Sequence, residues 1–344
     1  IRMENDMPDF SHIIGHEGII NHLQNAIAAG KVSHAYVFHG EEGMGKKTLA
    51  LAFAKALQCE AMQQRMQAGK IDACGRCVSC KQAEGRNHPD ILWITSDKNS
   101  IGVDEIRTQI NADIRIMPYQ SRYKIYIMDS AEKMTESAQN ALLKTIEEPP
   151  EYAVIILLAG SLQGLLPTIL SRCVILNLKP VDGRLIKEYL MGKLQIPDYV
   201  AEMAVGFCGG NVGKAIKYAS FEDFESMKED VFHILRYIDD MELHEIVSGI
   251  KTISKNKSSI NEYIDLMQMW FRDVLMLKAT NDPNLLLFKD EYRVIRKQAN
   301  TRSYDQIENI LKSMDDAKAK LKSNVNFDIT IELMLLSIKE RNNG

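Results

Sequence analysis

The first half of the chain alternates short apolar runs with stretches whose apolar residues recur at helical spacing. Four β-prone apolar runs have the length of buried strands: 36–40, 91–95, 124–128 and 153–159. The segments between them repeat apolar residues with helical periodicity: 46–59, 103–112 and 133–147. The last of these ends before Pro149 and Pro150, which cannot continue a helix. Strands that alternate with helices predict an α/β fold with a doubly wound parallel sheet.

Strand signals fade after residue 180, and helical patterns replace them. Short helical segments flank the sequence CGGN: 183–194, 198–207 and 211–219. Longer amphipathic segments follow, including 258–280 and 303–323. The sequence therefore predicts an α/β domain over 3–177, a small helical domain over 178–220 and an all-helical domain over 221–344.

Length and composition are those of a globular protein with two or three domains. The 344 residues are 45% apolar and 26% charged. They contain no apolar run of the roughly 18 residues that a transmembrane helix needs, and the first residues lack the apolar stretch of a secretory signal. We therefore expect a cytoplasmic protein with no membrane partner. A net charge of −4 argues against binding nucleic acid by bulk electrostatics alone.

Residues 40–48, GEEGMGKKT, follow the first predicted strand and lead into the first predicted helix. Gly40, Gly45 and Lys46 fill the phosphate-loop pattern G-x-x-x-x-G-K-[ST]. These glycines, with Gly43, allow the backbone to approach phosphates closely, and a lysine at a helix N-terminus reaches the β and γ phosphates. The segment predicts a nucleotide-binding loop. The alternative is a glycine-rich turn between strand and helix.

The position after this lysine departs from the pattern. It should carry a hydroxyl that binds Mg²⁺, but the residue is Lys47, whose ammonium offers only donors and repels a cation. Thr48 does not easily replace it, because one step along a helix turns the side chain by about 100°. We therefore expect a degenerate nucleotide site over Gly40, Gly43, Gly45 and Lys46 to Thr48, with ATP or ADP binding left open.

The strand 124–128 ends at Asp129, where a Walker B strand has its magnesium-binding aspartate. The next residue, which orients the attacking water in hydrolytic proteins of this class, is Ser130 rather than a glutamate. Glu132 lies nearby at the wrong offset to replace it. Asp129 is a candidate metal-binding residue, and the equal alternative is that it caps the helix that follows.

Four of the six cysteines fall within residues 59–80: Cys59, Cys74, Cys77 and Cys80. Without a secretory context, such clustering indicates a metal rather than disulfides. Four thiolates with two-residue gaps suit a tetrahedral Zn²⁺ site, and the continuation typical of bacterial iron–sulfur runs is absent. Because all four positions are filled, we expect a structural zinc in a module inserted after the first helix.

The segment TILSRCVIL contains Ser171, Arg172 and Cys173 before an apolar, strand-like run. Taken alone, an arginine at a helix end is usually a solvated charge or a favourable partner for the helix dipole. The residues by themselves therefore give Arg172 no function.

Several stretches carry a family resemblance: HAYVFHG at 34–40, HPDILWI at 88–94, GVDEIR at 102–107, NALLKTIEEPP at 140–150 and ILSRC at 169–173. Together they strongly resemble bacterial clamp-loader subunits of DNA polymerase III, which are AAA+ proteins. The resemblance covers roughly residues 9–220 and includes the cysteine insertion, whereas the C-terminal part agrees in length and class. It implies an AAA+ domain with a zinc module, a helical lid and a helical collar.

The family resemblance also implies partners for this chain and a difference between subunits that hydrolyse ATP and subunits that do not. Clamp-loader subunits, including gamma/tau and delta, form a five-subunit ring that opens the sliding clamp and places it on primer–template DNA. Gamma/tau subunits have a hydroxyl after the loop lysine, Asp-Glu in Walker B and a sensor 2 arginine. This chain has Lys47, Ser130 and Gly213 at those positions. We therefore predict a subunit without intrinsic ATPase activity, and the alternative is an ATP-hydrolysing gamma/tau-like subunit.

The resemblance gives Arg172 a different meaning from its isolated context. In clamp loaders the arginine of the Ser-Arg-Cys motif reaches across a subunit interface to the γ-phosphate held by a neighbour. An arginine supplied in trans stabilises the charge on the transferring phosphoryl group. The resemblance therefore implies that Arg172 completes the ATP site of a neighbouring gamma/tau subunit. A zinc-bearing nucleic-acid-binding module with a relict nucleotide fold is the alternative from another class.

Overall fold

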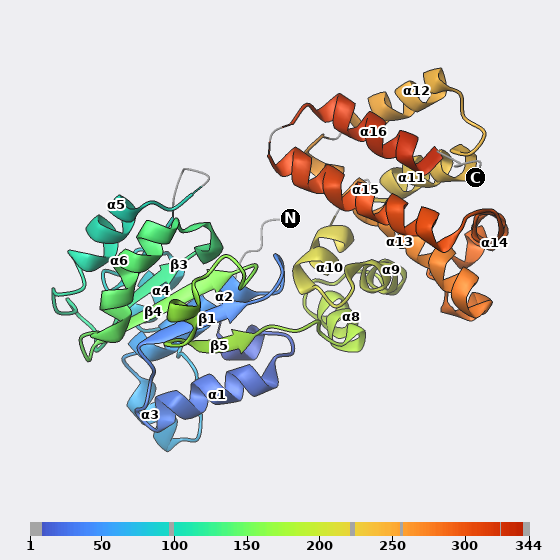
Figure 1. Ribbon diagram of the computed structural model, residues 1–344. Helices are drawn as coiled ribbons and strands as arrows, with labels where there is room; N and C mark the ends of the chain where they lie inside the picture. The colour runs from blue at the N-terminus through green and yellow to red at the C-terminus, as the bar shows by residue number, and fades with distance from the viewer. Residues whose placement is uncertain (1–8, 96–99, 221–223, 255–256, 324, 340–344) are drawn as a thin grey trace. The chain divides into compact units, whose positions relative to one another are not determined.

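A computed structural model describes residues 9–95, 100–220, 224–254, 257–323 and 325–339 of the chain. The chain divides into two compact units, Ile1–Ser220 (unit 1) and Phe221–Gly344 (unit 2). The expected domain starts at residues 3 and 221 lie outside the described residues. Figure 1 shows strands and helices in unit 1 and helices alone in unit 2.

Unit 1 is built on a five-stranded sheet with the order β2-β3-β4-β1-β5. Its strands are β1 (Ala35–His39), β2 (Ile91–Ile94), β3 (Lys124–Met128), β4 (Ala153–Ala159) and β5 (Val174–Asn177). Every neighbouring pair is parallel. The four predicted strands and the strand-like run after Cys173 are all present, which confirms the α/β class. Parallel strands bring the carboxyl ends of β1 and β3 to the same edge of the sheet, where ligand sites of such folds lie.

Helices cover both faces of this sheet. The helices of the sheet region are α1 (Glu17–Ala28), α2 (Lys46–Gln58), α3 (Met62–Gln67), α4 (Val78–Glu84), α5 (Val103–Ile106), α6 (Glu136–Glu147) and α7 (Pro167–Leu170). Short 3₁₀ turns occur at Phe10–His12 and Ala131–Lys133, and a π-helical turn occurs at Arg107–Asn111. The predicted helix 103–112 is thus α5 continued by the π turn. The predicted helix 133–147 begins with α6 at Glu136, where the Thr135 hydroxyl accepts a hydrogen bond from Ala138 N–H.

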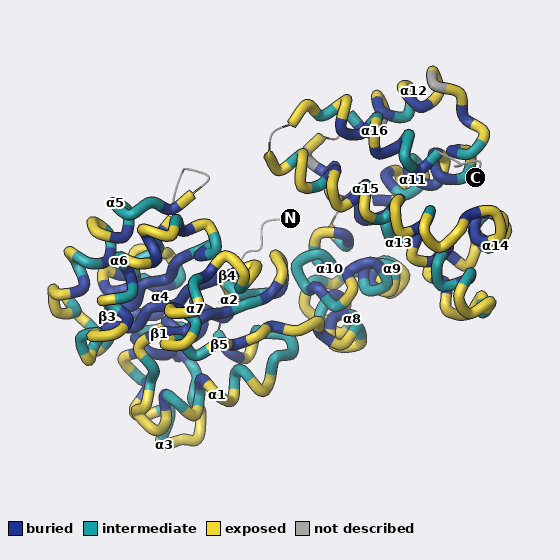
Figure 2. The backbone as a smooth tube through the Cα atoms, viewed as in Figure 1, coloured by how far each residue is buried: buried dark blue, intermediate teal, exposed yellow. Residues whose placement is uncertain are grey.

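Alternate strand residues point to opposite faces, and each face has its own hydrophobic core. Tyr36 and Phe38 pack in one core with residues of α1, α2 and α4. Val37 and Tyr126 pack in the other core with residues of α5, α6 and α7. Figure 2 shows the central strands in dark blue, because they are buried on both sides. This burial explains why β4, and β3 from Ile125 to Met128, are continuously apolar rather than alternating.

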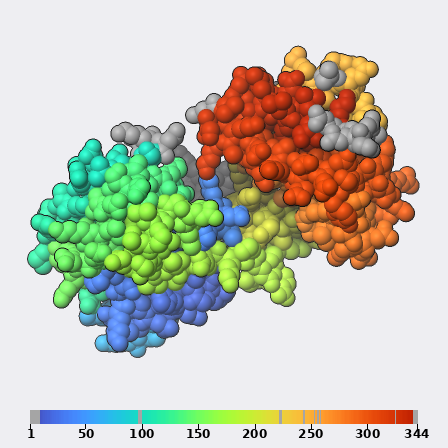
Figure 3. Space-filling model, viewed as in Figure 1, coloured from blue at the N-terminus to red at the C-terminus, as the bar shows by residue number. Residues whose placement is uncertain are grey.

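Three helices of unit 1 follow β5, and we refer to them as the lid: α8 (Gly183–Gly192), α9 (Asp198–Cys208) and α10 (Val212–Ala219). The cap residues Asp182 and Asn211 start α8 and α10 by accepting hydrogen bonds from the backbone N–H of Arg184 and Lys214. The α9–α10 pair meets at the CGGN turn, where Gly209 and Gly210 adopt φ of 56° and 81°. Figure 3 shows the sheet region of unit 1 as a continuous surface that runs from blue to green.

The described residues of unit 2 form helices and the loops between them, with no strand among them. Its helices are α11 (Phe224–Tyr237), α12 (Leu243–Ser254), α13 (Ile260–Thr280), α14 (Tyr292–Thr301), α15 (Tyr304–Lys322) and α16 (Phe327–Lys339), with 3₁₀ turns at Lys257–Ser259, Pro283–Leu285 and Lys289–Glu291. The buried Trp270 of α13 lies at its centre, and its Nε1 donates to Gln298 Oε1 at 2.7 Å. Ser303 and Gln306 form a capping box that starts α15. Within the described ranges, no helix has the length and apolar character needed to cross a bilayer.

Candidate functional site

The glycine-rich loop joins the carboxyl end of β1 to the N-terminus of α2. Gly43 and Gly45 have φ of 89° and 90°, a left-handed conformation that glycine adopts without steric cost. Gly40 lies against Leu178, the residue that follows β5: a Cβ added there would be 3.1 Å from Leu178 Cβ. The loop therefore has the backbone of a phosphate cradle, with the free N–H groups of a helix N-terminus directed at it.

Lys46 bends over this loop. Its Nζ donates hydrogen bonds to the carbonyl oxygens of Gly40 and, at 2.9 Å, Glu41. Burial lowers the pKa of Lys46, while the carboxylates of Glu132, Glu42 and Asp129 oppose that shift. The ammonium is therefore held directly above the part of the loop that would bind phosphates.

Lys47 forms an ion pair with Asp129, the residue that follows β3. The Lys47 Nζ lies 2.7 Å from Asp129 Oδ2, and their side chains are 57% and 27% exposed. The 3₁₀ turn that follows has Ser130 at its N-cap, so Asp129 contacts Lys47 rather than capping that turn. Thr48 is exposed on the next position of α2.

These residues do not fit a magnesium site. Mg²⁺ requires oxygen ligands in an octahedral arrangement and tolerates no cation among them. The hydroxyl position carries an ammonium, and the Walker B carboxylate is already paired with it. The position between Lys47 and Asp129, where Mg²⁺ would lie, therefore does not accept a divalent ion while this ion pair persists; we call this position the magnesium corner.

Glu132 forms a hydrogen bond at the end of β4. Its Oε2 accepts a hydrogen bond from Gly160 N–H at 3.1 Å, at the end of β4. Gly164 packs on its backbone, since a Cβ added at Gly164 would lie 2.9 Å from the Glu132 carbonyl oxygen. Ser130, in the position of the water-orienting glutamate, has φ of 53°. Glu132 thus links the turn after β3 to the end of β4, and one of its carboxylate oxygens is occupied by this hydrogen bond.

The lid contacts the loop directly at the start of α10. The side-chain amide of the buried Asn211 donates to the Glu42 carbonyl oxygen at 2.7 Å, and Gly213 N–H donates to the Gly43 carbonyl oxygen at 2.9 Å. A Cβ added at Gly213 would lie 2.7 Å from Gly43 Cα. The position of the expected sensor 2 arginine therefore lies backbone to backbone against the loop, where a side chain does not fit.

A cavity of about 410 Å³ lies between the turn before α1 and the segment that leads from β5 into the lid. His16, Asn177 and Val181 are among its lining residues. Burial lowers the pKa of His16, and the backbone of Met44 in the loop opposes that shift. Sequence reasoning gave these residues no role, although the glycine-rich turn before α1 was a signal that could have indicated one.

The four clustered cysteines come together after α2. Their sulfur atoms all lie within 4.8 Å of one another. Backbone N–H groups support the sulfurs: Cys74 N–H donates to Cys59 Sγ at 3.3 Å, and the N–H groups of Cys77 and Cys80 donate to the preceding cysteine of the cluster at 3.4 Å. Arg65 stabilises the segment between Cys59 and Cys74, because its Nε donates to the Asp72 carbonyl oxygen at 2.7 Å.

The electrostatics of this cluster suit a thiophilic metal ion. A hydrogen bond from the Cys80 thiol lowers the pKa of Cys59 to about 5, so one thiolate is stabilised by its neighbour. The same pair raises the pKa of Cys80. Without a cation, the thiolate of Cys59 is favoured while that of Cys80 is disfavoured. A bound cation would stabilise every thiolate at once. The cluster is therefore a set of four sulfur ligands that could hold a metal.

Arg172 follows α7 on the surface of unit 1. Its Nη1 donates to the Thr168 carbonyl oxygen at 3.0 Å, and its Nη2 lies 2.8 Å from Glu147 Oε1 at the end of α6. The Arg172 and Glu147 side chains are 41% and 45% exposed. Burial raises the pKa of the neighbouring Cys173 to about 12, so its thiol is not a nucleophile at neutral pH. Sequence reasoning did not identify Glu147 as a partner of Arg172.

Comparison with known proteins gives these features a family context. The family described as "DNA polymerase III, delta subunit" matches residues 15–182, and "DNA polymerase III, delta subunit, C terminal" matches residues 240–340. Together the two matched ranges cover more than half of the chain. The chain belongs to the clamp-loader subunits of DNA polymerase III.

Within this clamp-loader family the chain is similar to proteins of more than one subunit type. It is 28% identical to DNA polymerase III subunit delta' of Bacillus subtilis over 92% of this chain and 94% of that protein. It is 29% identical to subunit tau of the same organism over 94% of this chain, which corresponds to 60% of the tau protein. It is also 35% identical to subunit tau/gamma of Haemophilus influenzae over 53% of this chain and 25% of that protein. The resemblance to delta' therefore spans both proteins nearly completely.

Proposed function

We propose that this clamp-loader subunit does not hydrolyse ATP itself but supplies Arg172 to the ATP site of a neighbouring gamma/tau subunit, and so helps to load the sliding clamp onto primed DNA. The observation that carries the proposal is a contrast between two sites in unit 1. The exposed guanidinium of Arg172 is fixed in place, whereas the chain's own magnesium corner is closed by Lys47 and Asp129.

The loss of catalysis in this chain's own loop rests on separate features. Lys47 replaces the magnesium-binding hydroxyl and pairs with Asp129 at 2.7 Å. Ser130 offers no carboxylate to orient water, and Glu132 is bound to the end of β4. Gly213 lies against Gly43, where an arginine side chain does not fit. Each of these features removes a different requirement of phosphoryl transfer.

Arg172 has the properties required of a residue that acts on another subunit. Thr168 and Glu147 bind the Nη1 and Nη2 of its guanidinium, which reduces the rotamer entropy lost when it binds phosphate. With 41% of the side chain exposed, N–H donors remain accessible to a partner. An arginine supplied in trans accelerates phosphoryl transfer by ~10³ to 10⁵, or roughly 4–7 kcal/mol.

The partners in this proposal follow from the family and from the names of its relatives. The chain would occupy a five-subunit ring with gamma/tau and delta subunits, the helices of unit 2 forming part of a collar. Contact with the sliding clamp and with primer–template DNA would be shared with the other subunits. We assign the four-cysteine cluster to structural Zn²⁺, because four sulfur ligands complete a tetrahedral site and leave no position for substrate.

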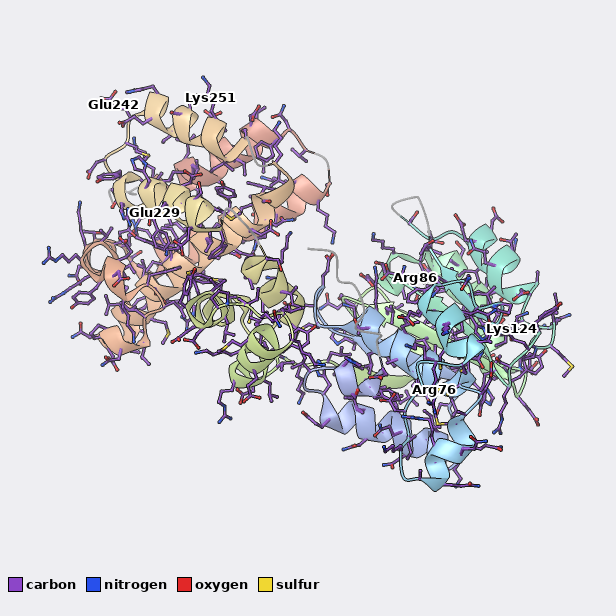
Figure 4. All side chains as sticks on the ribbon, turned by 180° about the vertical axis from the view of Figure 1, so that it is seen from behind. Arg76, Arg86, Lys124, Glu229, Glu242 and Lys251 are labelled. Atoms are coloured by element: carbon purple, nitrogen blue, oxygen red, sulfur yellow. The ribbon has the colours of Figure 1, made fainter. Side chains whose placement is uncertain are left out.

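The proposal is tested in a reconstituted clamp loader with the sliding clamp and primed DNA. Arg172→Ala in this subunit should lower the stimulated ATPase rate, and Arg172→Lys should restore little of it, because lysine lacks the planar fork. Arg86→Ala is the control, since Arg86 is also exposed and its guanidinium lies 4.7 Å from the Trp93 ring (Figure 4). Unchanged ATPase with Arg172→Ala in a correctly assembled complex would refute the role of this arginine.

The ATP-hydrolysing alternative makes an opposite prediction for the isolated chain. The similarity to tau over 94% of this chain is the observation that favours it. It requires ATP hydrolysis by the purified chain that disappears with Lys46→Ala. We expect no hydrolysis above the background of a mock purification, because the magnesium corner is closed.

A further inference from the structure

The glycine-rich loop retains the parts that bind phosphate while it lacks the parts that bind magnesium. Gly43 and Gly45 adopt the left-handed conformations of a cradle, α2 presents its N-terminal N–H groups, and Lys46 lies over the loop. The cavity of about 410 Å³ is lined by Asn177 and Lys179, the neighbours of Leu178, which packs against Gly40 of the loop. Gly213 closes on the loop through main-chain atoms only, so it adds a hydrogen bond but no side chain to the cradle.

Lys47 lies where a metal ion would otherwise link the loop to β3. In phosphate-loop proteins Mg²⁺ lies between the hydroxyl after the loop lysine and the Walker B aspartate. Here the Lys47 ammonium is 2.7 Å from Asp129 Oδ2, so it already neutralises that carboxylate. A divalent ion could enter only by displacing this ammonium or by lying beside it, and both are electrostatically unfavourable.

The same ammonium is well placed for phosphate oxygens. Lys46 and Lys47 are consecutive at the start of α2, and their charges add to the positive end of the helix dipole. The ammonium of Lys47 has three donors, of which the Asp129 contact uses one. A polyphosphate in the cradle would therefore meet two lysine cations in place of one lysine and one metal ion.

We propose that this chain binds a nucleoside di- or triphosphate without a divalent cation, with the Lys47 ammonium substituting for Mg²⁺ between the phosphates and Asp129. The bound nucleotide stays unhydrolysed and acts as a structural ligand of unit 1. This proposal is independent of Arg172, because it concerns binding by the chain itself.

The test measures binding of a fluorescent adenosine diphosphate and its triphosphate to the purified full chain. Each titration is carried out at fixed ionic strength, once in EDTA and once in excess Mg²⁺. We expect wild-type dissociation constants that agree within about threefold between the two conditions, or that are weaker in Mg²⁺. Lys46→Ala should abolish binding in both, which shows that the signal comes from this loop.

Two substitutions at position 47 distinguish metal-free nucleotide binding from the Mg²⁺-dependent nucleotide binding of an ordinary phosphate loop. Lys47→Ser supplies the missing hydroxyl and frees Asp129, so its affinity should become at least tenfold tighter in Mg²⁺ than in EDTA. Lys47→Arg keeps a cation and should stay insensitive to Mg²⁺. Thermal unfolding of each variant confirms that the fold is intact before binding is compared.

Two results would overturn the inference. Wild-type binding that tightens tenfold or more in Mg²⁺ would show that a metal ion enters despite Lys47. Absence of nucleotide binding in both conditions would show that the loop has kept only its shape. Neither result bears on the proposed role of Arg172, which is measured by hydrolysis in the assembled complex.

Discussion

The contact between the lid and the glycine-rich loop predicts that Gly213→Ala destabilises unit 1, although alanine is the better helix former. Gly213 lies in the first turn of α10 and its N–H donates to the Gly43 carbonyl oxygen at 2.9 Å. The added Cβ would lie 2.7 Å from Gly43 Cα and 2.8 Å from its carbonyl oxygen, where ordinary contacts begin at 3.4 Å. Because both atoms belong to the backbone, no rotamer change relieves the overlap.

The size of the effect follows from the shift that the overlap requires. Restoring an ordinary contact moves α10 by about 0.7 Å, which stretches the hydrogen bonds of Gly213 and Asn211 to the loop beyond their normal range. Overpacking costs about 1–3 kcal/mol and each lost hydrogen bond about 1 kcal/mol. The higher helix propensity of alanine relative to glycine offsets about 1 kcal/mol of this cost. We therefore expect a net loss of about 1–4 kcal/mol in the free energy of unfolding of unit 1.

The assay combines calorimetry with hydrogen exchange. Gly213→Ala should lower the melting temperature of unit 1 by about 2–4 °C for each kcal/mol lost, and it should speed amide exchange in the glycine-rich loop and at the start of α10. Gly192→Ala is the matched control, because Gly192 ends α8 and an added Cβ there meets none of the described atoms within 4 Å. If Gly213→Ala proved as stable as the Gly192→Ala protein, the close contact between lid and loop would be refuted.

Two further predictions concern the metal cluster and the core of unit 2. The purified chain should contain about one zinc ion. Cys80→Ser should lose it while Cys208→Ser keeps it, and elemental analysis that finds no metal in the wild type would contradict the assignment. Asp273→Ala should lower the free energy of unfolding in urea by about 2–4 kcal/mol, because the N–H groups of Leu287 and Phe288 both donate to Asp273 Oδ2 at 2.7 and 2.8 Å. Asp273→Asn retains an acceptor oxygen and should cost less. Burial raises the pKa of Asp273 above 3.8, so stability should fall as pH rises through the raised value, a slope that Asn removes.

The centre of the sheet could be predicted because its strands are buried on both faces. The run 153–159 is apolar throughout and the run 124–128 is apolar after Lys124, and they coincide with β4 and β3. Helix ends depended on local signals that were easier to misjudge. The predicted helix 103–112 continues through a π turn at Arg107–Asn111, a change of hydrogen-bond register that no periodicity in so short a segment reveals.

The chemistry of individual positions could also be predicted, whereas contacts between distant segments could not. Lys47 was identifiable as a departure from the loop pattern, but its ion pair with Asp129 depends on how β1 and β3 are ordered in the sheet. The same limit applies to Gly213. The sequence showed that a glycine stands at the position of the sensor 2 arginine, but it did not show that the loop fills the space that an arginine side chain would need. Glu147 illustrates it again, because its contact with Arg172 joins the ends of α6 and α7.

The central claim is that Arg172 acts on the ATP of a neighbouring subunit, and single-turnover hydrolysis in the reconstituted clamp loader tests it most directly. The loader is filled with ATP, mixed with the sliding clamp and primed DNA, and sampled by rapid quench, with wild-type or Arg172→Ala protein as this subunit. The account predicts that one class of sites slows by ~10³ or more, while the amount of bound ATP stays the same. Hydrolysis at every site with the wild-type rate would contradict it.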